Sequence, residues 1–249
     1  MTRAHWATLR ILTWNIHKGI GGVDRRYDPW RIIALLEHYS PDVALLQEVS
    51  EGLPQANHHN QAQMLAETLG MGHWAYHPEH QFKVGGYGNL ILSKWPLSQV
   101  EHVDLTIGGR KKRGLLKARV HFKEDAQSRS LVVYNMHLGL AGSERGEQLK
   151  RFLQCQPFAH VHHNTPLVVG GDLNDLWGTL GPRFLQPQGL VRLGRLANTF
   201  PAAFPLRPLD GLFARGDVRL QHWQVPRMEL AATASDHRPI LADLELRVG

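Results

Sequence analysis

The sequence predicts an α/β (α+β) protein in which two mostly antiparallel sheets pack face to face with helices on the outside. Short apolar runs separated by Gly, Pro and charged turns recur along the chain and indicate strands. Each half of the sequence begins with a strand and a helix and then continues into strands, which favours two stacked sheets over one doubly wound sheet. Because no linker, low-complexity tract or short repeat interrupts this pattern, we expect residues 1–249 to form a single domain.

The first half is predicted to contain two helices and a series of antiparallel strands. The first helix should begin at Asp28-Pro29, an N-cap followed by a proline at the first helical position, and should end near Ser40-Pro41. A second helix over 62–69 is stopped by Gly70. The expected strands are 9–15, 42–48, 90–92, 99–105, 115–122 and 131–137.

The second half should open with the longest helix, over 143–161. Its first turn carries Glu144 and Glu147, where the helix dipole favours acidic side chains. A buried strand should follow over 167–172, after which the pattern is irregular as far as Pro208. The remaining expected strands are 209–213, 218–220 and 240–246.

Composition narrows the class of protein. Hydrophobic residues make up 43% and charged residues 20% of the chain, which excludes a disordered protein. The net charge of +6 is compatible with phosphate-bearing partners. A single cysteine, Cys155, cannot form an internal disulfide. No apolar run approaches the ~20 residues of a membrane span, and Met1–Trp6 lacks the features of a signal peptide. We therefore expect a cytoplasmic protein without a transmembrane segment.

The stretch Leu167–Asn174 carries the clearest functional signal. An apolar run ends at Gly170 and Gly171, and a carboxylate and a carboxamide, Asp172 and Asn174, follow at once. By itself the Asp-x-Asn pair is also typical of an Asx turn that closes a strand. The functional interpretation is favoured because polar side chains stand beside most other apolar runs as well. They are Asn15, Glu48, His137, Asp210, Asp236 and His237.

If these strand ends meet at one edge of the two sheets, they form a pocket of carboxylates, amides and imidazoles. The sequence contains no Cys-x-x-Cys motif and no pair of helix-borne histidines, so a tetrahedral zinc site has little support. Oxygen ligands predominate, which suits Mg²⁺ or Mn²⁺.

Seven short segments, in this order, resemble a known family. They are Thr13–Gly19, Leu46–Val49, Gly88–Ser93, His137–Gly139, Gly171–Asn174, Leu209–Asp210 and Ser235–Pro239. The chain resembles the endonuclease/exonuclease/phosphatase superfamily, most closely its small single-domain bacterial members. This resemblance covers almost the whole chain and implies the DNase I-like fold, a four-layered α/β sandwich, and a metal-dependent hydrolase of phosphate esters.

The resemblance also implies roles for individual residues. Glu48 would be the main metal ligand, with Asn15 and Asp236 assisting. Asp172 would orient or deprotonate the attacking water, and Asn174 would hold that water or a phosphate oxygen. The two histidines would act on the phosphate. His237, oriented by Asp210, would stabilise the charge of the transition state. His137 would donate to a phosphate oxygen or protonate the leaving alkoxide.

Two further positions are assigned to substrate binding together with Asn174. Arg113 ends the basic run 110–113, which is equally typical of a solvated hairpin turn. His17 occupies a position where some nucleases of the family carry an Asp, which weakens the case for a second metal. Gly211 stands where the family usually has a bulkier residue, so the substrate assignment stays open.

For four accessory residues we favour an ordinary structural role over a functional one. We expect Arg145 and Gln148, just after His137, to be surface-helix residues rather than braces of the active-site loop. Trp14 and Trp177 flank proposed catalytic residues, and we expect buried packing rather than stacking on a base.

The function predicted from the sequence is Mg²⁺-dependent hydrolysis of a phosphodiester, of nucleic acid or phospholipid type, by in-line attack of water. One alternative is a phosphomonoesterase that acts on a small phosphate such as an inositol phosphate. Another is a non-catalytic module of the same fold that binds phosphate or nucleic acid, because a fold alone does not establish an activity.

Overall fold

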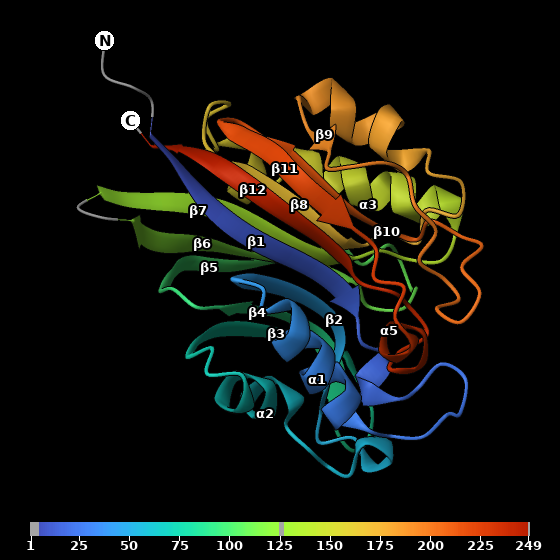
Figure 1. Cartoon of the computed structure of the whole chain (residues 1–249). Helices are drawn as coiled ribbons and strands as arrows, with labels where there is room; N and C mark the ends of the chain where they lie inside the picture. Colours follow the sequence, from blue (N-terminus) through green and yellow to red (C-terminus); the bar gives the residue numbers. More distant parts are fainter. Residues whose placement is uncertain (1–4, 125–126, 249) are drawn as a thin grey trace.

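The computed structural model describes residues 5–124 and 127–248, and two six-stranded sheets form its centre (Figure 1). The expectation for the N-terminal segment Met1–Trp6 falls in part on residues 1–4, outside the described residues. Over the residues that are described, no helix is long and apolar enough to cross a membrane.

The first sheet has the strand order β11-β12-β1-β2-β4-β3. Its members are β1 (His5–Asn15), β2 (Val43–Glu51), β3 (His73–Gln81), β4 (Gly86–Ser93), β11 (Val218–Gln224) and β12 (Ile240–Val248). The central pair β1–β2 is parallel, and the other neighbours in this sheet are antiparallel.

The second sheet has the order β5-β6-β7-β8-β10-β9. Its members are β5 (Leu97–Asp104), β6 (Gly114–Glu124), β7 (Gln127–His137), β8 (Leu167–Asp172), β9 (Val191–Arg192) and β10 (Asp210–Arg215). Here β7 and β8 form the parallel pair, and the remaining pairs are antiparallel. The expectation of two mostly antiparallel sheets is therefore confirmed.

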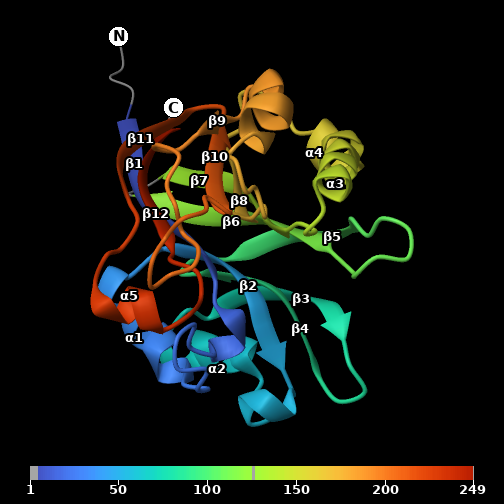
Figure 2. The same ribbon diagram turned by 90° about the vertical axis from the view of Figure 1, so that its right-hand side faces the viewer.

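Helices cover the outer face of each sheet, as Figures 1 and 2 show. The helices α1 (Pro29–Tyr39), α2 (Gln61–Thr68) and α5 (Glu229–Thr233) pack on the first sheet, and α3 (Gly142–Gln154) and α4 (Gln156–Ala159) pack on the second. Between the sheets, alternate apolar side chains of both form a continuous core that includes Leu45, Ile91 and Val133. The short turns are η1 (His17–Gly19), η2 (Pro54–Ala56), η3 (Gly181–Leu185) and η4 (Gln186–Gln188). The four-layered sandwich is thus confirmed.

The prediction of one continuous helix over 143–161 is wrong, because the segment forms two helices, α3 and α4. The chain leaves the helical conformation at Cys155, whose ψ is 145°, and starts again as the one-turn helix α4. Pro157 explains the break, because it has no N–H to donate to the carbonyl four residues earlier and its ring collides with that carbonyl.

The end of β8 lies unusually close to β7, and Gly171 makes this possible. Its φ is +145°, which side chains rarely tolerate, and a Cβ atom there would lie 1.9 Å from the carbonyl oxygen of Met136. The parallel register that results pairs Gly171 with Met136 and Asp172 with His137.

We predict that Gly171→Ala lowers the free energy of unfolding by about 2–4 kcal/mol, because it adds both backbone strain and a collision with β7. Urea unfolding followed by circular dichroism measures this loss. Gly109→Ala is the control, since a Cβ there meets no atom within 4 Å, and it should change stability little. Equal losses in the two variants would contradict the close approach.

Candidate active site

The candidate site lies at the edge where β1, β7 and β8 end and β10 begins. Figure 2 shows the molecule from the side on which β1 ends. The strand β8 lies between β7 and β10, and the register places Asp172 beside His137 on one strand and beside Asp210 on the other. All three side chains are buried. Strand pairing alone therefore brings together three residues that are far apart in the sequence.

Asp172 is the centre of the cluster. From the opposite sheet, the Asn15 amide donates to Oδ2 of Asp172 (3.0 Å), and the backbone N–H of Asn174 donates to Oδ1 (2.9 Å). The Nε2 atoms of His137 and His237 lie 3.5 and 3.7 Å from Oδ2. Burial raises the pKa of Asp172 to about 6, although the charge of His237 opposes this shift.

His237 is held as a cation by Asp210. Its Nδ1 lies 2.9 Å from Oδ2 of Asp210, which also accepts a hydrogen bond from the Thr199 hydroxyl. Burial alone would lower the pKa of this imidazole, but the carboxylates of Asp210 and Asp172 outweigh burial and raise it to about 10. The indole N–H of Trp14 fixes the loop by donating to the His237 carbonyl (2.7 Å).

His137 has the opposite character and is neutral. Burial, followed by the charge of Arg113, holds its pKa well below the ordinary value. An Arg113 N–H lies 3.4 Å from Nδ1 of His137. Because arginine only donates, Nδ1 is the acceptor and the proton resides on Nε2, which faces Asp172.

Glu79, on β3, is a site residue that the sequence did not reveal. Its Oε1 accepts hydrogen bonds from the Asn89 amide (2.6 Å) and the Gly114 backbone (2.8 Å), and its Oε2 lies 3.8 Å from Nδ1 of His137. Burial raises the pKa of Glu79 to about 8, with Arg113 opposing the shift. The polar strand 73–81 carries no apolar run, so the signal used at the other strand ends was missing here.

Glu48 stands at a β-bulge. The pairing of β2 with β4 shifts between Leu46 and Val49, and Glu48 has a φ of +54°, so its side chain is redirected relative to a regular strand. The carboxylate forms an ion pair with Lys18. Burial would raise the pKa of Glu48, but the charge of Lys18 outweighs burial and the pKa falls to about 2. The strand expected to end at Glu48 in fact continues to Glu51.

The donor set around Glu48 fits a hard divalent cation. Glu48 is a largely buried, permanently ionised carboxylate that already faces a positive charge. Asn15 pairs with Gln47, the residue before Glu48, and its Oδ1 accepts the His17 backbone N–H (3.0 Å). Oδ1 of Asp236 lies 3.8 Å from the His17 ring. Carboxylate and amide oxygens are the ligands that Mg²⁺ and Mn²⁺ prefer.

A second group of possible ligands consists of Asp172, Asp210 and His237, whose ligand atoms all lie within 4.8 Å of one another. Here the imidazole is protonated and bound through Nδ1 to one of the two carboxylates. A protonated imidazole has no lone pair for a metal, so this cluster is better suited to handling protons and phosphate oxygens.

Among the predicted substrate-binding residues, Arg113 is buried and contacts His137, so it is not part of a solvated turn. The Asn174 amide N–H₂ donates to the Leu138 carbonyl (2.8 Å) and so ties the loop after His137 to the end of β8. His17 lies next to Asp236.

Two expectations for accessory residues are wrong. Arg145 and Gln148 are buried and brace the loop after His137: Gln148 accepts from the Gly139 N–H (2.8 Å), and Arg145 donates to the Leu140 carbonyl (2.5 Å). Trp14 is buried as expected, but Trp177 is 67% exposed.

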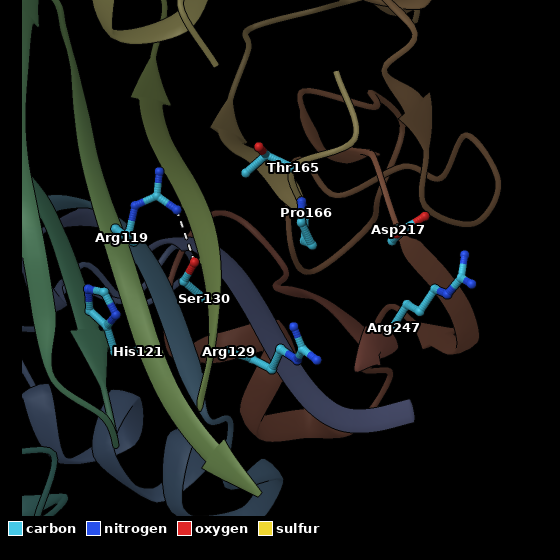
Figure 3. A pocket seen from close by; sticks show the side chains of 8 residues that line it. All are labelled: Arg119, His121, Arg129, Ser130, Thr165, Pro166, Asp217 and Arg247. Atoms are coloured by element: carbon cyan, nitrogen blue, oxygen red, sulfur yellow. Dashed lines mark hydrogen bonds between the residues drawn. The ribbon is translucent and has the colours of Figure 1, made fainter. Parts of the chain in front are cut away.

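A cavity of about 530 Å³ lies away from this cluster, near the start of β7 and of β8 (Figure 3). None of the candidate site residues line it. It is bordered by Arg119, His121, Arg129, Ser130, Thr165, Pro166, Asp217 and Arg247. The catalytic interpretation therefore rests on the buried cluster at the opposite ends of these strands.

Residues 12–237 match the Endonuclease/Exonuclease/phosphatase family, and the chain belongs to this family. The sequence is 29% identical to the uncharacterized protein YbhP of Escherichia coli (strain K12), over 96% of this chain and 97% of YbhP. The crystal structure of an endonuclease/exonuclease/phosphatase from Beutenbergia cavernae is similar, with a TM-score of 0.80, 26% identity, and coverage of 96% of this chain and 72% of that one. The 2',3'-cyclic phosphatase ANGEL2 shares the fold at 15% identity, with a TM-score of 0.73 and full coverage of both chains (100% each).

The ion pair of His237 and Asp210 gives a direct test by NMR. In metal-free protein, Asp210→Asn should lower the pKa of His237 from about 10 to near or below the ordinary 6.5, because burial then acts without its main opposing charge. A pH titration of the His237 side-chain resonances measures this. Asp243→Asn, which removes a carboxylate on β12 that is bound to Arg10, is the control and should leave the titration unchanged. A His237 pKa that stays near 10 in Asp210→Asn would refute the assignment.

The raised pKa of Glu79 predicts a pH-dependent stability. Below about pH 4.5 this residue is protonated in both folded and unfolded chains and has no effect. Between about pH 4.5 and about 8 the unfolded chain ionises while the folded chain keeps its proton, so stability is lost as pH rises.

Glu79→Gln should abolish that loss. Relative to the parent protein, the variant should gain stability by a few kcal/mol between pH 4.5 and 8. Urea unfolding of both proteins across this range, in EDTA, measures the difference. The exposed residue Glu67 provides the control, Glu67→Gln, whose difference from the parent should stay flat. A flat difference for Glu79→Gln would show that Glu79 is ionised in the folded state.

Proposed function

We propose that this protein is a Mg²⁺- or Mn²⁺-dependent phosphoesterase that hydrolyses a phosphodiester, of nucleic acid or phospholipid type, by in-line attack of water. The observation that carries the proposal is the buried carboxylate of Asp172 between two imidazoles of opposite character, one cationic and one neutral. Family membership supports phosphate-ester hydrolysis as the general chemistry. We treat residues 1–249 as one catalytic domain.

Asp172 is suited to act on the attacking water. A pKa of about 6 leaves the carboxylate ionised at neutral pH while making it a stronger base than a solvated aspartate. As the water oxygen bonds to phosphorus and the ester P–O bond breaks, Asp172 takes the water proton, and the leaving alkoxide takes a proton from solvent water. Asn174, two residues further on, holds the water or a phosphate oxygen.

The two imidazoles would act on the phosphate. His237 carries a full positive charge whose Nδ1–H is bound to Asp210, so its Nε2–H is directed to the site and stabilises charge on the phosphate oxygens. His137 has its proton on Nε2 because Arg113 occupies Nδ1. A neutral imidazole is a hydrogen-bond donor rather than a strong acid, which favours its role as a donor to phosphate over protonation of the leaving alkoxide.

The metal would be held by Glu48, Asn15 and Asp236. When bound, it would supply Lewis-acid polarisation of the phosphate and a template for the substrate. Lys18, which now neutralises Glu48, would share that carboxylate or release it. Arg113, beside His137, and His17, beside Asp236, would contact the substrate.

Two alternatives to a phosphodiesterase remain, a phosphomonoesterase and a non-catalytic binding module. A phosphomonoesterase would release inorganic phosphate from substrates such as inositol phosphates. A non-catalytic module would bind phosphate or nucleic acid without turnover, but each proposed catalytic position holds a chemically competent residue, which favours an enzyme.

Turnover measured with DNA, sphingomyelin, phosphatidyl lipids and inositol phosphates, each with Mg²⁺ and with EDTA, tests this proposal. We expect hydrolysis of a diester in Mg²⁺ only, and a loss of about 10³-fold in Glu48→Ala and in Asp172→Ala, because each removes a group that acts in the transition state.

Glu67→Ala, an exposed glutamate of α2, is the matched control and should retain full activity. Circular dichroism and unfolding curves establish that the variants are folded. Undiminished hydrolysis in folded Glu48→Ala or Asp172→Ala would refute the mechanism, and hydrolysis confined to monoesters would favour the first alternative.

A further inference from the structure

The loops that surround the candidate active site carry large apolar side chains exposed to solvent. Leu140 follows the His137 loop and is 72% exposed, and Trp177 follows Asn174 and is 67% exposed. Phe204, in the loop before β10, is 71% exposed. The same loops also expose Leu176, Leu196 and Leu206. Such a concentration of exposed apolar residues at one edge is typical of a contact surface.

These loops adjoin one another and the site. The turn between Phe200 and Arg207 is closed by a β-bridge, and the Phe200 ring lies 5.0 Å from the His237 ring. The Arg207 guanidinium lies 4.8 Å from the centre of the Trp177 ring. Leu196 packs directly against Gly178. These loops therefore lie together beside the site. We call their exposed apolar residues the apolar rim: Leu140, Leu176, Trp177, Leu196, Phe204 and Leu206.

The β3–β4 hairpin and the β5–β6 loop project from the same side of the molecule (Figure 2). The hairpin tip exposes Phe82 and Val84. Tyr87 connects these loops to the site, because the ammonium groups of Lys18 and Lys111 lie 4.9 and 5.2 Å from its ring centre. The hairpin thus adds exposed apolar side chains to those of the apolar rim.

The charge of these loops is entirely positive. Segments 81–86, 105–112, 138–142 and 194–208 contain no Asp or Glu. Their basic residues are Lys83, Arg110, Lys111, Lys112, Arg195 and Arg207. In the remaining loop the carboxylate of Asp175 is buried and accepts the N–H groups of Thr179 and Leu180, while Glu144, near Arg110, is also buried. The edge therefore presents positive charge and apolar surface without exposed acids in these segments.

We propose that this edge docks on a lipid–water interface that contains anionic phospholipids, with the apolar rim inserted among the acyl chains and the basic residues on the headgroup phosphates. Four of the six rim residues are leucines, which gain free energy from insertion into lipid but offer no ring on which a nucleobase can stack. This leucine content favours lipid over a nucleic acid, and Trp177 and Phe204 are equally suited to a lipid interface. Basic residues near a membrane surface add attraction to anionic lipids.

This inference rests on the proposed function in one respect, since docking would present phosphodiester headgroups to Asp172 and His237. It narrows the substrate class to phospholipid diesters at an interface. The docking itself depends only on the rim and the basic loops.

Co-sedimentation with vesicles tests the docking independently of catalysis when it is done in EDTA. Vesicles of phosphatidylglycerol and phosphatidylcholine should bind the parent protein, and vesicles of phosphatidylcholine alone should bind it about tenfold more weakly. Leu140→Ser/Phe204→Ser should weaken binding to the mixed vesicles at least tenfold, because two inserted side chains are lost.

The matched control is Val100→Ser/Val191→Ser, which removes two exposed apolar side chains (49% and 64%) from β5 and β9. It should bind like the parent protein. A second readout uses Trp177, whose insertion should shift tryptophan emission to the blue in the parent protein and not in Trp177→Phe.

Absence of vesicle binding, or equal binding of the rim and control variants, would overturn the proposal. Binding of single-stranded DNA that is lost in the rim variant, without vesicle binding, would assign the edge to nucleic acid instead. Failure of docking with intact diester hydrolysis would remove this inference alone, whereas docking without any hydrolysis would retain it and remove the proposed function.

Discussion

The burial of the Asp172 carboxylate is the constraint on which the site depends. A lone carboxylate in the interior is destabilised, and the protein compensates with the Asn15 amide, the Asn174 backbone N–H and a cationic His237. His237 is in turn a cation because it lies against Asp210. Since each charge is maintained by the next in a region of low dielectric, the cluster behaves as one electrostatic unit rather than as separate residues.

The sandwich fold holds the residues of this cluster in place mainly through strand pairing. The register of β8 with β7 and β10 places His137 and Asp210 on either side of Asp172, and β1 brings Asn15 across from the facing sheet. Rigid strands hold these side chains more narrowly than loops do, which suits groups that must meet one phosphate. The glycine before Asp172 makes the close approach of β7 and β8 possible, so local backbone chemistry and catalytic geometry are linked there.

Much of this arrangement could be predicted from the sequence, because apolar runs that end in polar residues mark buried strands that end at a site. That signal identified Asn15, His137, Asp172 and Asp210. It missed Glu79, whose strand is mostly polar, and it placed the end of β2 at Glu48, where a bulge continues the strand. Arg145 and Gln148 are polar residues of a helix, so the sequence suggests that they lie on the surface. Only their hydrogen bonds to the loop after His137 show that they are buried and hold that loop.

The buried cluster and the loops around it differ in what their residues require. The cluster would carry the chemistry common to phosphate esters, and the loops would select the substrate. Asp172, at the end of a strand, and His237, in the buried loop before β12, need burial and fixed partners to keep their charges. Trp177, Phe204 and the exposed basic residues 110–112 bear no such constraint, and the exposure of the two aromatic rings is unfavourable in water unless a partner covers them. These loops are where positive charge and exposed apolar side chains lie close to the site, so we expect them, rather than the buried cluster, to determine which partner this edge binds.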